Sequence, residues 1–158
     1  MNKRLFTLVV LLILTLIGCS NKEVNDEIDK EKPPKAFIKI GAKTYETKLG
    51  TYCWHFGNKG VCVDTAGPVE LLKDKQPIKV KRGEEITFIM NYEPKPNKFH
   101  VIQINNNNET EIKVENNRFT APTQKGVFYY SYGVWWMDKK KANVSNGSAF
   151  YAFALEVE

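Results

Sequence analysis

From residue 36 to the end of the chain, short apolar runs with a period of two alternate with clusters of Gly, Pro and Asn. Ile86, Phe88 and Met90 occupy every second position of one such run. Alternate residues of a β-strand point to the same face of a sheet, so each run predicts a strand with one buried face. No long stretch has helical spacing; residues 69–73 could form one helical turn or simply a crossing between strands. The predicted strands are 36–40, 44–49, 51–55, 61–64, 78–80, 85–91, 99–105, 111–114, 127–134 and 148–157.

Many short strands separated by turn signals are typical of an all-β sandwich or barrel. A short strand that ends at Pro122, followed by Gly126 and the aromatic run 128–130, resembles the late strands of immunoglobulin-like domains. The resemblance spans roughly the second half of the chain. It implies an immunoglobulin-like antiparallel β-sandwich over residues 36–158, with a corner tyrosine whose hydroxyl group bonds to the backbone.

The N-terminus has a different pattern, in which Lys3 and Arg4 precede an almost unbroken apolar run at residues 5–17. This run is shorter than the roughly 20 residues that a permanent membrane helix needs. A charged start and a small residue at the exit are typical of a secretion signal. We therefore expect residues 1–18 to be a signal peptide.

The run closes with Leu16-Ile17-Gly18-Cys19, which resembles the lipobox of bacterial lipoproteins. The resemblance covers the first 19 residues and implies cleavage after Gly18 and a covalent diacylglyceryl lipid, of the palmitate type, on Cys19. Two acyl chains anchor a protein stably, whereas one binds weakly. We expect a lipid anchor on the extracytoplasmic face of the cell membrane and no other cofactor. The alternative is an ordinary signal peptide or a cysteine in a core helix.

Residues 19–35 contain few apolar side chains, and acids alternate with bases as far as Pro33 and Pro34. Such a segment cannot bury enough surface to offset the entropy of ordering. We expect a lipidated, flexible tether over residues 19–35. Part of it could be helical, but the two prolines would end that helix.

The two cysteines other than Cys19 lie in the stretch 50–64. If Gly57 and Asn58 form a two-residue turn, Cys53 stands directly opposite Cys62. Opposed residues of antiparallel strands have Cα atoms about 4.5–5.5 Å apart, which suits a disulfide. An even pair of cysteines in an exported protein favours the same pairing. The sequence therefore predicts a Cys53–Cys62 disulfide across a hairpin.

A metal site is the alternative for this hairpin. In the same register Cys53, His55 and Cys62 share one face, and with Asp64 they could bind zinc. Their spacing matches no standard zinc motif, and an exported compartment oxidises paired thiols. A copper site of the cupredoxin type lacks its Cys-His-Met set. We expect no metal and retain a zinc- or copper-handling hairpin as the alternative.

The hairpin sequences Tyr52-Cys53-Trp54 and Cys62-Val63-Asp64, together with residues 68–72, resemble segments of uncharacterised lipoproteins of bacilli. The likeness covers about a third of the chain beyond the signal, and it implies location without an activity. The abundance of Lys and Asn is consistent with a Gram-positive source of low GC content.

The net charge is a weak indicator of partners, and the expected export from the cell argues against nucleic acid. The chain has 23 basic and 18 acidic residues, and loss of Lys3 and Arg4 would leave a net charge of +3. This weak excess does not favour nucleic-acid binding. It could steer the protein toward anionic envelope polymers or lipid headgroups.

Aromatic and basic residues meet near the end of the chain, where Trp135 and Trp136 precede Lys139, Lys140 and Lys141. In a loop, the tryptophans could stack on sugars or a partner; alternatively, one fills the core and the other covers it. The lysines could contact anionic polymers or form a solvated hairpin tip. The candidate binding surface combines the 52–64 hairpin with a 135–141 loop: Tyr52, Trp54, His55, Trp135, Trp136, Lys139, Lys140 and Lys141.

No serine elbow, phosphate loop or close carboxylate pair is present, and His55 and His100 lie far apart in the sequence. We therefore expect a non-catalytic binding module at the cell envelope, whose ligand is an envelope protein, a wall polymer or a small molecule. A metal-handling lipoprotein is the first alternative. A small hydrolase is the second, because catalytic triads assemble in space. The sequence leaves the ligand and the oligomeric state open.

Overall fold

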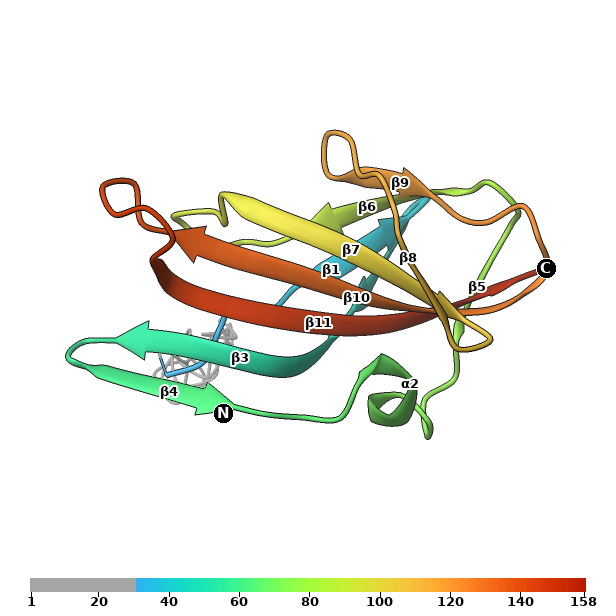
Figure 1. Cartoon of the computed structure of the whole chain (residues 1–158). Helices are drawn as coiled ribbons and strands as arrows, with labels where there is room; N and C mark the ends of the chain where they lie inside the picture. Colours follow the sequence, from blue (N-terminus) through green and yellow to red (C-terminus); the bar gives the residue numbers. More distant parts are fainter. Residues whose placement is uncertain (1–30) are drawn as a thin grey trace, which may run out of the picture.

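The computed structural model describes residues 31–158, so the predicted signal peptide, Cys19 and most of the predicted tether lie outside the described residues. Two sheets pack face to face (Figure 1), which confirms the predicted all-β sandwich. The smaller sheet has the order β2-β1-β6-β9, and the larger has the order β4-β3-β11-β10-β7-β8. All neighbours pair antiparallel except β5, which runs parallel to the end of β11.

The smaller sheet consists of β1 (Phe37–Ile40), β2 (Lys43–Glu46), β6 (Glu85–Ile89) and β9 (Arg118–Thr120). The larger sheet consists of β3 (Lys48–Phe56), β4 (Lys59–Val63), β5 (Ile78–Val80), β7 (Lys98–Asn105), β8 (Asn108–Glu111), β10 (Gly126–Met137) and β11 (Ser145–Val157). One helical turn, α2 (Pro68–Leu71), follows β4 and begins with a proline at its first position, where no backbone N–H group is needed. No helix among residues 31–158 is long and apolar enough to cross a membrane.

The predicted strand 44–49 is divided between the two sheets. The chain leaves the smaller sheet after β2 and enters the larger sheet as β3, which continues without a break through the predicted strand 51–55. Thr47 is buried at the crossing, and its side-chain Oγ1 and backbone N both donate to the Ala36 carbonyl, at 2.7 and 3.0 Å. The crossing is therefore held by hydrogen bonds to the start of β1.

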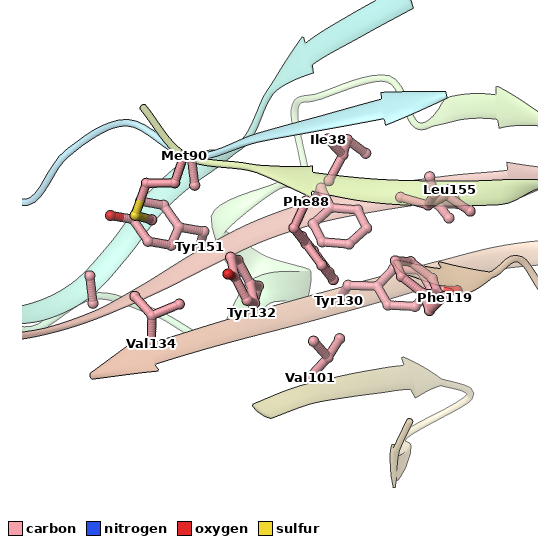
Figure 2. Packing of buried hydrophobic residues seen from close by; sticks show 14 of the residues in the cluster. Ile38, Phe88, Met90, Val101, Phe119, Tyr130, Tyr132, Val134, Tyr151 and Leu155 are labelled. Atoms are coloured by element: carbon pink, nitrogen blue, oxygen red, sulfur yellow. The ribbon is translucent and has the colours of Figure 1, made fainter. Parts of the chain in front are cut away.

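The central hairpin of β10 and β11 supplies ten of the 22 buried residues in the main core cluster. These strands pair from Gly126 opposite Val157 to Met137 opposite Ser145, and their alternate residues face the smaller sheet. Figure 2 shows the aromatic rings that fill the space between the sheets. Phe88 stacks on Tyr132 with ring centroids 4.1 Å apart. The buried residues of this core run from position 36 to position 157, so the sandwich contains its own hydrophobic core.

Buried tyrosine hydroxyl groups find partners within the sandwich. Tyr130 donates to the side chain of Gln103 at 3.0 Å, and Tyr151 donates to the Pro34 carbonyl. A tyrosine hydroxyl group bonds to the backbone as the resemblance implies, but this tyrosine is Tyr151 on β11 and lies outside the aromatic run 128–130.

The packed part of the chain begins earlier than residue 36. Pro33 and Pro34 are both buried, and Lys35 forms an ion pair of 3.3 Å with Glu46 on β2. The last residues of the predicted tether are therefore part of the sandwich, because the Pro34 carbonyl accepts a hydrogen bond from the core.

Candidate functional site

The β3–β4 hairpin has the predicted register. Phe56 stands opposite Lys59, and Cys53 stands opposite Cys62, with Gly57 in the left-handed region at φ +55° as the first turn residue. The two cysteine sulfurs form a disulfide, with Cα atoms 4.1 Å apart. The predicted Cys53–Cys62 disulfide is confirmed.

The two faces of the hairpin have different roles. Tyr52 and Trp54 are buried between the sheets, where the Trp54 ring lies edge-on to Trp136 with centroids 4.9 Å apart. Their prediction as surface residues is therefore wrong. Because strand residues alternate between faces, burial of Tyr52 and Trp54 leaves Cys53 and His55 on the outer face of the larger sheet.

The two tryptophans also divide between the faces. Both lie in β10, so the prediction of a loop from residue 135 is wrong; the loop begins at Asp138. Trp136 is buried, and its indole Nε1 donates to the Pro94 carbonyl at 2.7 Å. Trp135 is half-buried on the outer face. The alternative in which one tryptophan fills the core and the other covers the sheet is confirmed.

The three lysines occupy the loop between β10 and β11. Lys139, Lys140 and Lys141 are all exposed. The carboxylate of Asp138 accepts the backbone N–H groups of Lys140 and Lys141 at 2.7 and 2.9 Å, and these bonds hold the pKa of Asp138 below its usual value. The backbone of this positively charged tip is therefore ordered by Asp138.

Three rings on the outer face form a cluster, which we name the aromatic triad: His100, Trp135 and Phe150. The Trp135 ring lies edge-on to His100 at 5.0 Å and to Phe150 at 5.4 Å between centroids. All three are half-buried, and they meet above Gly133. A Cβ atom on Gly133 would lie 2.8 Å from Trp135 Cη2 and 2.9 Å from Phe150 Cε1. The triad therefore depends on the absence of a side chain at this position.

A cavity of about 290 Å³ lies beside the triad, and we name it the Gly50 pocket after the glycine of β3 that lines it. Ser131 and Ala152, which are paired on β10 and β11, line it from the sheet with small side chains. Phe150 belongs to both the triad and the pocket. The residues that complete the lining are Thr51, Thr65, Ala66, Gly67, Pro68, Leu71 and Tyr151.

Hydrogen bonds hold the rim of this pocket in place. Thr51 Oγ1 donates to Asp64 Oδ1 and accepts the backbone N–H of Thr65, each at 3.1 Å. The segment after β4 is thereby attached to β3 just before α2. Asp64, predicted as an alternative metal ligand, participates in this rim.

The helical turn covers the neighbouring part of the same face. Leu72, which follows α2, packs on Ala152 and Ala154 of β11, with Leu71 and Tyr129 at the border. A third layer thus shields one part of the outer face, whereas the rings of the triad stay half-exposed. Apolar ring surface thus remains accessible to solvent beside the covered part of this face.

The four residues of the alternative metal site, Cys53, His55, Cys62 and Asp64, are not arranged to bind one metal ion in this structure. Among residues 31–158, no group of three or more His, Cys, Asp and Glu side chains could hold a metal ion. His55 Nδ1 donates to the Asn146 carbonyl at 2.9 Å, and the sulfurs of Cys53 and Cys62 are bonded to one another. Metal binding by these thiols would require prior reduction of the hairpin.

Sequence reasoning missed His100, Gly133 and Phe150 as site residues. One signal was available in the sequence. The residues of β10 and β11 that face the core are apolar, and several residues between them, such as Trp135, Phe150, Ala152 and Ala154, are apolar as well. A strand that is apolar on both faces indicates cover on both faces. That two-sided pattern predicts a third layer or a ligand.

No protein-family model matches the chain, and no curated protein sequence is significantly similar to it.

Proposed function

We propose that this protein is a membrane-anchored extracytoplasmic lipoprotein that acts as a non-catalytic binding module at the cell envelope. Its ligand would bind on the outer face of the larger sheet, at the aromatic triad and the Gly50 pocket. The observation that carries the proposal is the two-sided apolar pattern of β10, of which Trp135 remains half-exposed on the outer side.

Antiparallel sheets commonly present polar residues on their solvent side. Contiguous apolar surface that departs from this pattern often marks a site for a ligand or a partner. The triad brings three rings together around Gly133, and the hydrogen-bonded rim of the pocket holds the adjacent hollow open. The triad comes from β7, β10 and β11, whereas the pocket is lined by residues of β3, β10 and β11 together with the segment 65–71.

The size and charge of the surface suggest what it binds. A volume of about 290 Å³ is at the lower end for small-molecule pockets, so the pocket suits one ring or short chain of a larger ligand. Lys98 lies opposite Trp135 in the β7–β10 register, and the exposed lysines of the next loop add positive charge. A wall polymer or an envelope protein with anionic and apolar groups fits these features.

Trp135→Ala tests the binding surface. The fragment 31–158 contains its own core, so it can be immobilised and exposed to purified wall polymer and to solubilised envelope proteins. We expect Trp135→Ala to weaken capture about tenfold or more, as truncation of an aromatic anchor commonly does. Ser131→Leu, which fills the pocket, should weaken it too.

Phe99→Ala is the matched control. Phe99 is 40% exposed on β7, and its ring lies near Tyr132 on the side of the smaller sheet. Capture should persist in this variant. Equal capture by wild type, Trp135→Ala and Ser131→Leu would refute the outer face as the binding site.

The anchor is tested on the full chain in the cell. Labelling with radioactive palmitate should mark the wild type and should be lost in Cys19→Ala, which should also leave the membrane fraction. Retained lipid label in Cys19→Ala would refute the lipid anchor while leaving the binding surface untouched.

A further inference from the structure

Strand β4 ends the larger sheet, and all five of its residues are exposed. On one side it pairs with β3, as Figure 1 shows at the lower border of the sheet. No other strand of the described part of the chain pairs with its second side. A free strand edge presents unpaired backbone N–H and C=O groups that can accept another strand.

The register identifies which backbone groups face outward. Opposed residues of antiparallel strands lie about 4.5 Å apart in pairs without mutual hydrogen bonds and about 5.5 Å apart in hydrogen-bonded pairs. The Cα distance of 4.1 Å between Cys53 and Cys62 places them in the first class. The N–H and C=O groups of Cys62 therefore point away from β3, and those of Gly60, two residues earlier, do the same.

Other edges of this molecule carry the charged residues that commonly prevent strand pairing. Lys43 lies on β2, Glu109 and Glu111 lie on β8, and Arg118 lies on β9. On β4 the only charge is at the first residue, and positions 60–63 are uncharged. The disulfide also holds β4 on β3, so this edge is already ordered before any partner binds, which lowers the entropic cost of association.

We propose that β4 pairs antiparallel with β4 of a second copy of this chain, about a two-fold axis at Cys62. The sequence Val-Cys-Val is symmetric about this cysteine. In that register Val61 lies opposite Val63 of the partner subunit, and the outward-facing Gly60 lies opposite Asp64 of the partner subunit. One self-complementary edge thus extends the larger sheet across two molecules, as a two-fold interface requires.

The side chains of the edge favour a second copy as the occupant. Val61 and Val63 are 36% and 37% exposed, and the pairing would remove both from water against their symmetry mates. Lys59 would lie opposite Thr65 of the partner subunit, so no like charges meet directly. No residue of β4 itself belongs to the triad or lines the pocket, although the pairing would reach Asp64 and Thr65 at the pocket rim. The pairing is measured without any ligand, so its failure and the failure of the proposed function are distinguishable.

Sedimentation of the fragment 31–158 from micromolar to millimolar concentration tests the pairing. We expect a reversible monomer–dimer equilibrium. The variant Val61→Lys/Val63→Lys places lysine opposite lysine on both sides of the axis. The variant Val61→Lys/Val63→Glu places opposite charges at the same positions. The first should raise the dissociation constant about tenfold or more, and the second should raise it less.

Val144→Lys is the matched control, because Val144 is 41% exposed but lies in the loop between β10 and β11. It should leave the equilibrium unchanged. A wild type that is monomeric over the whole range would overturn the proposal. So would a dimer that all three lysine-bearing variants leave unchanged.

Amide hydrogen exchange gives a second readout that needs no variant. The amides of Gly60 and Cys62 should exchange more slowly at high protein concentration, because they point to the partner. The amide of Val61, which faces β3, should not change. Slowing of Val61 alone, or of none of the three, would contradict pairing at this edge.

Discussion

Gly133 and Gly147 lie where aromatic rings occupy the space that a side chain would need. A Cβ atom on Gly147 would lie 2.6 Å from two ring atoms of Trp54, a distance that real contacts do not reach. Trp54 is buried against Trp136, so its ring cannot swing into solvent without opening the core. At Gly133 the conflict is with the triad on the outer face. The same residue type therefore protects the core at one position and the candidate site at the other.

Gly147→Ala should destabilise the protein by about 1–3 kcal/mol, the usual cost of forcing extra volume into a packed region. The measurement is the free energy of unfolding in urea for the fragment 31–158. Gly67→Ala is the comparison, because no atom lies within 4 Å of a Cβ atom there. It should cost less than about 1 kcal/mol, as a change of helix cap. Equal costs for the two variants would mean that the Trp54 ring relaxes freely.

At the scale of elements, the β3–β4 hairpin was predictable because its information is local. A two-residue turn at Gly57 sets every pair along the two strands, and the pairing of Cys53 with Cys62 follows from counting. The division of residues 44–49 between two sheets was not predictable in this way. It depends on Thr47, whose bonds to Ala36 form only once β1 is in place.

Removal of the disulfide should destabilise the fold moderately. Cys53 and Cys62 are separated by nine positions, and closing a loop of this size corresponds to about 2–3 kcal/mol in the chain-entropy model. We expect this loss of unfolding free energy in the variant Cys53→Ser/Cys62→Ser of the fragment 31–158. The reduced wild type should behave similarly, and the unreduced wild type should expose no reactive thiol. Two freely reactive thiols without reductant would contradict the disulfide and favour the metal alternative.

For the molecule as a whole, the sandwich is held by aromatic residues from both sheets. Tyr130, Tyr132 and Tyr151 lie between the sheets, and burial raises the pKa of each phenol above its usual value of 10, in the case of Tyr132 to about 12. Proximity to Tyr132 adds to the rise at Tyr151. A phenol with a raised pKa keeps its proton in the folded state at a pH where the unfolded chain has lost it.

Stability should therefore be constant with respect to these groups below pH 10 and should fall between about pH 10 and 12. In that window the unfolded state binds fewer protons than the folded state, so the unfolding free energy decreases with pH, by up to about 1.4 kcal/mol per unit for each group. Urea unfolding of the fragment at several alkaline pH values measures this slope. Tyr132→Phe should reduce the slope relative to wild type. An unfolding free energy that stays level up to about pH 11 would be inconsistent with buried, protonated tyrosines.

The sequence by itself determined the features that depend on near neighbours along the chain: the alternating strands, the β3–β4 register and its disulfide. The lipid anchor at Cys19 rests on the same kind of local pattern and stays a prediction. Only the tertiary structure decided that Trp136 is buried while Trp135 joins the triad. The period of two shows that neighbours point apart, but which face is covered depends on the packing of distant strands. The Gly50 pocket has the same origin, because β3 lies beside β11 at the other end of the sequence.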